Sequence, residues 1–107
     1  MSNISNKIET IKESILKNVS AKIIYLFGSH AYGEPTEKSD IDIYLVVADN
    51  VTNHSEIYGK ILFDLSLKKI YYIDLLISRE SVFNERKTAF NLEEIVSQKG
   101  KIIYETQ

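Results

Sequence analysis

The sequence predicts a small α+β domain, in which helices cover one face of a short mixed β-sheet. Two observations lead to this class. Apolar residues near the N-terminus recur at steps of three and four, which is the period of an amphipathic helix. Further along, short runs rich in β-branched and aromatic residues are separated by polar segments, as is typical of strands. The expected order is helix, strand, strand, helix, strand, helices and strand.

The first part of the chain is expected to hold one helix and two strands. The helix covers residues 4–18. Its apolar stripe consists of Ile4, Ile8, Ile11, Ile15 and Val19. A buried strand follows over residues 22–27 and ends at Gly28, and a polar connector covers residues 29–39. The second strand, residues 41–47, is strongly apolar apart from its opening.

The second part continues with helices that flank two more strands. A helix is expected over residues 54–69 and a third strand, which looks wholly buried, over residues 71–77. A short helix follows over residues 79–87, and another opens with a capping residue at Asn91 and ends before a glycine. Residues 101–105 complete the sheet as a strand of the edge type. No repeat, linker or low-complexity segment interrupts this order.

Size and composition restrict the class of protein. A chain of 107 residues fits one domain, so residues 1–107 are expected to form a single unit. No apolar run approaches the roughly 18–20 residues that cross a bilayer, and the N-terminus lacks the pattern of a signal peptide. Because the chain has no cysteine, a cytoplasmic location is expected. The net charge is −2 and the basic residues are scattered, which makes nucleic acid an unfavourable partner.

Three aspartates are the candidate catalytic residues. Side chains alternate along a strand, so Asp40 and Asp42 point to one face while the apolar residues between and after them point to the other. Two adjacent carboxylates repel each other, and Mg²⁺ resolves that conflict by binding carboxylates together with water and substrate phosphates. Asp74 interrupts the third strand, where a charge is costly unless it is paired or bound to a metal. The alternative is that Asp40 belongs to a turn and Asp42 and Asp74 face solvent.

The Gly28-Ser29 pair would supply the second half of a site. A glycine lets the backbone approach a phosphate closely, and a serine at the start of a following helix offers a hydroxyl and free amide donors. Alone, the pair is equally compatible with an ordinary turn that ends a strand. Together with the aspartates it indicates a site for a phosphorylated ligand.

This combination resembles the signature of the DNA polymerase β-like nucleotidyltransferase superfamily. Gly28-Ser29 is followed after ten residues by the Asp-x-Asp motif at Asp40 and Asp42, and Asp74 lies on a later strand. The match is closest to the minimal nucleotidyltransferases, single-domain proteins of about this length, whose usual ending is similar to residues 99–105. The resemblance covers nearly the whole chain and implies the palm-like nucleotidyltransferase fold.

The resemblance also implies roles for single residues. Asp40 and Asp42 would bind Mg²⁺ ions that hold a nucleoside triphosphate, while Asp74 would complete the metal site and deprotonate the attacking hydroxyl. Gly28 and Ser29 would clamp the triphosphate.

Two further polar residues are expected to bind the nucleotide, namely His30 and Ser39. Many relatives carry an arginine in the region of His30, so this sequence departs from the pattern at a phosphate contact. A histidine is largely neutral at pH 7, and a structural or surface role for His30 remains open.

The expected reaction is transfer of a nucleoside monophosphate, AMP in the first instance, from ATP or another triphosphate to a hydroxyl. The expected core uses almost every one of the 107 residues, so we expect no acceptor-binding domain within them. Many minimal nucleotidyltransferases are antitoxins of HEPN-domain toxins, and the resemblance implies AMP transfer to a toxin tyrosine. Two alternatives stay open: a non-catalytic module that masks a partner, and a transferase for a small, aminoglycoside-like molecule that acts as a homodimer.

Overall fold

The computed structural model describes residues 4–36, 39–89 and 91–106, which form helices around one four-stranded sheet. In chain order the elements are α1 Ile4–Asn18, β1 Ala21–Phe27, α2 Ser29–Tyr32, β2 Ile41–Val47, α3 His54–Leu67, β3 Ile73–Arg79, α4 Glu80–Arg86, α5 Leu92–Lys99 and β4 Lys101–Glu105. Among the helices described, none combines the length and the apolar character that a membrane span requires.

The strand order is β3-β2-β1-β4. β1 runs antiparallel to both β2 and β4, whereas β2 and β3 are parallel. A parallel pair needs a crossover connection, and α3 supplies it. The predicted mixed sheet is therefore confirmed, and β3 and β4 are its two edges.

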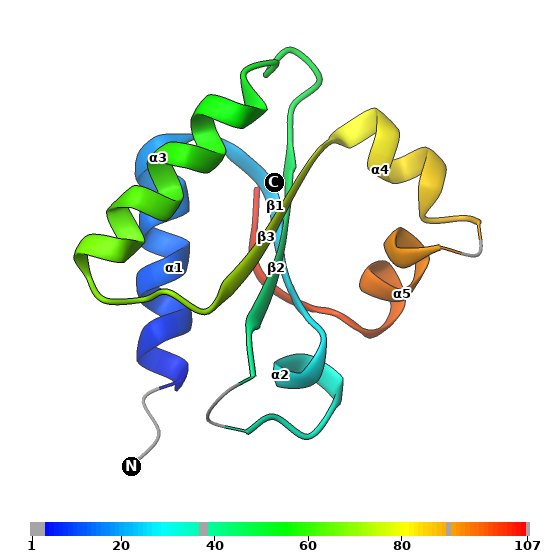
Figure 1. Ribbon diagram of the computed structural model, residues 1–107. Helices are drawn as coiled ribbons and strands as arrows, with labels where there is room; N and C mark the ends of the chain where they lie inside the picture. The colour runs from blue at the N-terminus through cyan, green and yellow to red at the C-terminus, as the bar shows by residue number, and fades with distance from the viewer. Residues whose placement is uncertain (1–3, 37–38, 90, 107) are drawn as a thin grey trace.

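Helices pack on both faces of the sheet, which Figure 1 shows nearly edge-on. α1 and α3 cover one face and bury the alternate apolar residues of β2 beneath them. α4 and α5 lie on the other face, where Phe83 and Val96 pack against the aromatic side chains of β1 and β2. The α+β class is confirmed, but the expectation that helices cover only one face is corrected. Tyr25, Phe27 and Tyr44 make that second face apolar enough to need a cover of its own.

β3 differs from its prediction in place and in burial. It begins at Ile73 rather than at residue 71, because the parallel ladder with β2 starts where Ile41 faces Ile73. Tyr71 and Tyr72 are exposed, and the strand alternates between buried and exposed residues instead of being wholly buried. Its position at the sheet edge explains this pattern, since one side of the strand has no neighbouring strand among the described residues.

Candidate active site

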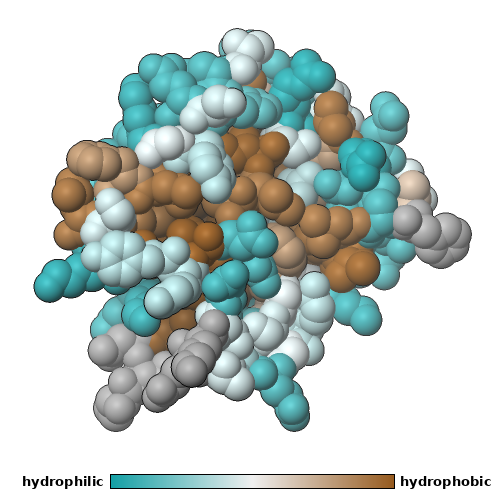
Figure 2. All heavy atoms as spheres, in the orientation of Figure 1, coloured by the Kyte–Doolittle hydropathy of each residue, from teal (hydrophilic) through white to brown (hydrophobic). Residues whose placement is uncertain are grey.

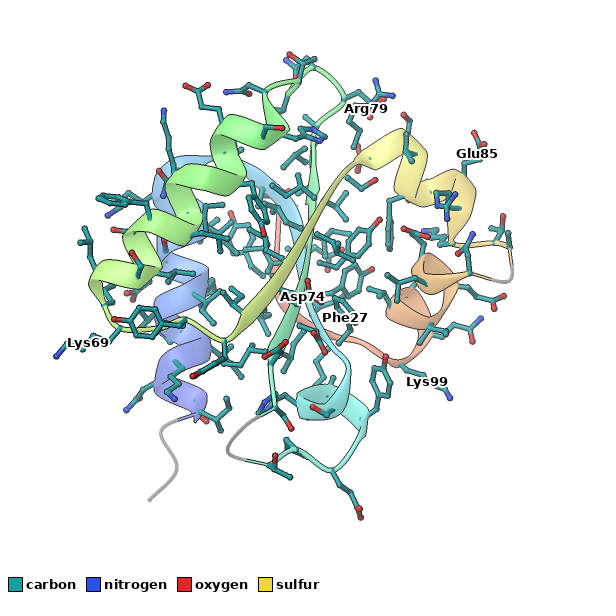
Figure 3. All side chains as sticks on the ribbon, viewed as in Figure 1. Phe27, Lys69, Asp74, Arg79, Glu85 and Lys99 are labelled. Atoms are coloured by element: carbon teal, nitrogen blue, oxygen red, sulfur yellow. The ribbon has the colours of Figure 1, made fainter. Side chains whose placement is uncertain are left out.

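Two of the predicted carboxylates are direct neighbours across the parallel pair of strands. Asp42 of β2 faces Asp74 of β3, and Asp42 also faces Phe27 of β1 on its other side. Figure 3 labels Asp74 and Phe27, which lie on the two strands that flank Asp42. Because Ile41 and Ile43 are buried under α1 and α3, Asp42 must project from the opposite face. The alternation that was expected from the sequence therefore places the carboxylates on one face.

The acidic residues lie close enough for their charges to influence the pKa of Asp42. Burial raises the pKa of the Asp42 carboxyl above its usual range, and the negative charges of Asp74 and Asp40 raise it further, while His30 acts in the opposite direction. Asp40 lies just before β2 and is exposed, as is Asp74, whereas Asp42 is half-buried. Asp42 is thus the most constrained of the three carboxylates.

Gly28 places the backbone of the β1–α2 turn against Asp42. Its φ of 73° and ψ of −154° lie in a region that residues other than glycine rarely occupy. A Cβ atom built on Gly28 would lie only 2.0 Å from Oδ2 of Asp42. The absence of a side chain at Gly28 is therefore a geometric requirement of the site, and the predicted turn and the predicted carboxylate are in contact.

The predicted connector contains the one-turn helix α2, which starts at Ser29. The carbonyl of Gly28 accepts hydrogen bonds from the amides of Ala31 (3.0 Å) and Tyr32 (3.1 Å), which closes the turn. The leading amides of such a turn have no carbonyl one turn earlier to bond to. Ser29 thus stands where its amide and hydroxyl can meet an anion near Asp42.

His30 and Ser39 hold the connector at its two ends. Nε2 of His30 donates to the carbonyl oxygen of Ser39 at 3.3 Å, so the ring links α2 to the residue just before Asp40. The hydroxyl of Ser39 accepts a hydrogen bond from the amide of Thr36 at 2.9 Å. The structure therefore gives both residues local contacts that order the loop, and nucleotide contact by either residue stays a prediction.

A buried network under the acidic face was missed from the sequence. Tyr44 lies two residues after Asp42 on the same face, and its hydroxyl donates to Oε2 of Glu93 at 2.8 Å. Nε of Arg86 donates to Oε1 of the same carboxylate at 2.9 Å. Tyr44 is only 2% exposed, so its hydroxyl lies inside this network and does not face water. The network ties α4 and α5 to the strand that carries Asp42.

Burial and hydrogen bonding shift the pKa of both acids in this network. Burial raises the pKa of the Tyr44 hydroxyl to about 12, and the nearby charge of Glu93 acts in the same direction. For Glu93, burial alone would raise the pKa, but hydrogen bonds from Tyr44 and Arg86 outweigh it and hold the pKa below its usual range. No short sequence motif joins residues 44, 86 and 93, so only the fold could reveal them.

The acidic face fits a divalent cation by its chemistry. Within the described residues, no three acidic or histidine side chains are close enough, as they stand, to hold one ion together. Asp42 and Asp74 are nevertheless adjacent hard oxygen donors, and their mutual repulsion with Asp40 raises the pKa of Asp42. A bound cation would remove that repulsion, and Mg²⁺ prefers a site of one or two carboxylates completed by water and phosphate oxygens.

A row of carboxylates behind a glycine turn, at one end of a small mixed sheet, defines the class of metal-assisted phosphoryl-transfer enzymes. Comparison with known families makes the class specific. The family model described as "Polymerase beta, Nucleotidyltransferase" matches residues 9–107. The chain belongs to this nucleotidyltransferase family, whose members generally use a divalent metal ion, and the resemblance stated from the sequence is confirmed.

Individual relatives agree with this assignment. A protein of Methanocaldococcus jannaschii whose name places it among the protein adenylyltransferases (MJ0604) is 34% identical over 83 residues, which cover 78% of each chain. The crystal structure of a toxin–antitoxin with AMP-PNP is similar over 95% of this chain and 73% of that one, at 25% identity and a TM-score of 0.58. A complex of the tri-AMPylated HEPN toxin of Shewanella oneidensis with its MNT antitoxin shares the fold, with 21% identity, a TM-score of 0.56 and 96% and 73% of the two chains covered.

Proposed function

We propose that this protein is a Mg²⁺-dependent protein adenylyltransferase that transfers AMP from ATP to a tyrosine of a HEPN-domain toxin, and so acts as an antitoxin in the cytoplasm. The observation that carries the proposal is the row of Asp42 and Asp74, set directly against the Gly28 turn. Such a row places metal-binding oxygens beside a turn that can hold a triphosphate.

The nucleotide side of the reaction belongs to the β1–α2 turn. The missing side chain at Gly28 leaves room for the Asp42 carboxylate beside the turn, and Ser29 offers its amide and hydroxyl to the phosphate chain. Asp40 and Asp42 would hold Mg²⁺ together with Asp74. When bound, the ion would neutralise the triphosphate and polarise its α-phosphorus.

Asp74 is the residue that would meet the acceptor hydroxyl. This carboxylate is exposed at the sheet edge, so a hydroxyl from another molecule can reach it, whereas half-buried Asp42 is less accessible. In the proposed reaction the acceptor oxygen forms a bond to the α-phosphorus, the bond from that phosphorus to the bridging oxygen breaks, and pyrophosphate leaves. Asp74 accepts the proton of the hydroxyl.

A protein acceptor is supported by the relatives. The archaeal relative is named a protein adenylyltransferase, and the toxin–antitoxin structure contains an ATP analogue. The Shewanella complex contains a toxin that carries AMP groups. Tyrosine is the acceptor that the minimal nucleotidyltransferase resemblance implies, and its hydroxyl is a suitable nucleophile once Asp74 takes the proton.

The proposal is tested by incubating the protein with ATP labelled at the α-phosphate, Mg²⁺ and a purified HEPN-domain toxin as the candidate acceptor. Wild type should label the partner, and Asp42→Asn should abolish the label. Asp49→Asn is the matched control, because Asp49 lies beyond the other end of β2 and accepts a hydrogen bond from the Ser81 amide at 2.9 Å. An unlabelled partner, or a label that Asp42→Asn leaves unchanged, would refute the proposal.

A further inference from the structure

β3 is an edge strand whose outer backbone groups are open to a further strand. The carbonyl of Tyr72 accepts from the amide of Ile41 at 2.9 Å, which shows which backbone groups of this segment point towards β2. Because backbone groups alternate in a strand, those of Ile73, Leu75 and Ile77 point away from β2, and no strand of the described sheet lies there. Such an edge is a template for pairing with another chain.

The opposite edge, β4, is protected in ways that β3 is not. β4 has five residues and pairs with β1 through a register shift between Ile24 and Tyr25. β3 has seven residues and keeps an unbroken register with β2 along its whole length. Short length and irregular pairing discourage edge association, so β3 is the more receptive edge.

A groove runs beside this edge, between β3 and the start of α3. It has a volume of about 260 Å³ and is lined by His54, Ser55, Tyr58, Leu75, Leu76 and Ile77. Figure 2 presents the face on which β3 lies nearest the viewer, and hydrophobic residues extend across its centre. Tyr72, 69% exposed, and Leu76, 37% exposed, add to this apolar surface. The groove could hold one large apolar side chain.

The Asp74 face of β3 and the groove between α3 and β3 meet at Leu76, which lines the groove and lies two residues from Asp74. Side chains at positions 72, 74 and 76 share one face, so Tyr72 and Leu76 flank Asp74 along the edge. Neighbouring side chains on an added strand would alternate between the Asp74 face and the α3 groove. Diagonal partners on adjacent strands are about 7–8 Å apart, a distance that a tyrosine side chain spans.

We propose that the acceptor tyrosine is presented in an extended segment that pairs with β3 as a fifth strand, with an apolar residue next to the tyrosine in the groove between α3 and β3. This inference rests on the proposed function and specifies its acceptor. A second copy of this chain is a poorer occupant, because antiparallel pairing of two β3 strands about Leu76 would set Asp74 opposite Ser78 of the copy. That arrangement would place a serine beside Asp74, in the position that the acceptor tyrosine must occupy.

The mode of docking is tested with synthetic peptides at millimolar concentration. The extended peptide alternates threonine and leucine around a central tyrosine. The helical peptide carries the same tyrosine in an alanine-rich helix. Label transfer from ATP is measured for both. The extended peptide should be labelled at least tenfold faster. Two further versions of the extended peptide carry N-methyl groups on the odd-numbered or on the even-numbered amides. One version should lose labelling and the other should keep it, because only one edge of the peptide pairs with β3.

Two variants of α3 test the groove with whichever acceptor is labelled, including the partner protein. Tyr58→Lys places a charge in the groove and should lower kcat/KM for the acceptor about tenfold, with the KM for ATP unchanged. Phe63→Lys, on the same helix but outside the groove, should change neither value.

The outcomes separate the two proposals. Strand pairing would be refuted, and the transferase function would still stand, by any one of three results. These are equal labelling of the helical and extended peptides, equal labelling of the two N-methylated peptides, and equal transfer by Tyr58→Lys and Phe63→Lys. If wild type labels no tyrosine in any of these acceptors, the proposed function fails, and this inference fails with it.

Discussion

Replacing Gly28 by alanine should damage both stability and activity. A non-glycine residue at φ 73° and ψ −154° costs about 1–3 kcal/mol of folding free energy. The new methyl group would also stand 2.0 Å from Oδ2 of Asp42, far inside van der Waals contact, so the carboxylate must move. We expect Gly28→Ala to lower the free energy of unfolding by about 1–3 kcal/mol and to reduce label transfer by about a hundredfold or more, since displacing a positioned group by 1 Å can have that effect.

Gly59→Ala is the matched control for this substitution. Gly59 lies in the exposed part of α3, and a Cβ atom there would contact nothing within 4 Å. Alanine at this position should stabilise the protein by about 0.5–1 kcal/mol and leave transfer unchanged. Urea unfolding, followed by circular dichroism, measures the first quantity and transfer from labelled ATP the second. If the two alanine variants are equally stable and equally active, the account of the Gly28–Asp42 contact is wrong.

Three other predictions concern single groups. Asp42→Asn should stabilise the metal-free protein, because folding raises the pKa of Asp42 and wild type therefore loses stability as the pH rises above the unfolded pKa of about 3.8. In thermal melts from pH 4 to 7 without Mg²⁺, the melting temperature of the variant should depend less on pH than that of wild type. The same pH dependence in both proteins would contradict this. Glu93→Gln should lower the free energy of unfolding by about 1–3 kcal/mol, because it weakens the hydrogen bond to Arg86. In wild type, the stabilisation by the Glu93 carboxylate should decrease as the pH falls below about 4.5, since folding lowers the pKa of Glu93. Urea titrations at pH 7 and pH 3.5 measure both effects, and equal stability of wild type and variant at pH 7 would refute the first. Ser29→Ala should raise the KM for ATP about tenfold. Ser39→Ala should change this KM less than about threefold, because the hydroxyl of Ser39 is hydrogen-bonded within its own loop. A larger effect of Ser39→Ala in steady-state kinetics would contradict this order.

Local patterns in the sequence are sufficient to predict most elements of the fold. The alternation of Ile41, Ile43 and Leu45 with polar or aromatic residues places β2 correctly and puts its two faces on the correct sides of the sheet. Asn91 caps α5 as expected, with its side chain accepting from the Glu94 amide at 3.2 Å. Such features depend on residues within a few positions of one another, which is why one sequence suffices to find them.

Features that depend on distant residues could not be predicted. β3 looks buried in the sequence because its residues are apolar, yet the sheet order leaves it at the edge. The second core forms only when Phe83 and Val96 meet Tyr44 from segments roughly forty and fifty residues away. The spacing of Gly28 and Asp42 suggests a shared site, but their direct contact follows from the antiparallel register of β1 and β2.

The central claim is that the Asp42–Asp74 row transfers AMP to a tyrosine of a partner protein. The most direct measurement is mass spectrometry of a purified HEPN-domain toxin after incubation with ATP, with and without Mg²⁺, and with wild type, Asp42→Asn or Asp74→Asn. We predict that the toxin gains the mass of one or more whole AMP groups, mapped to tyrosine, only with wild type and Mg²⁺ present. An unmodified partner, or equal modification by either asparagine variant, would contradict the claim.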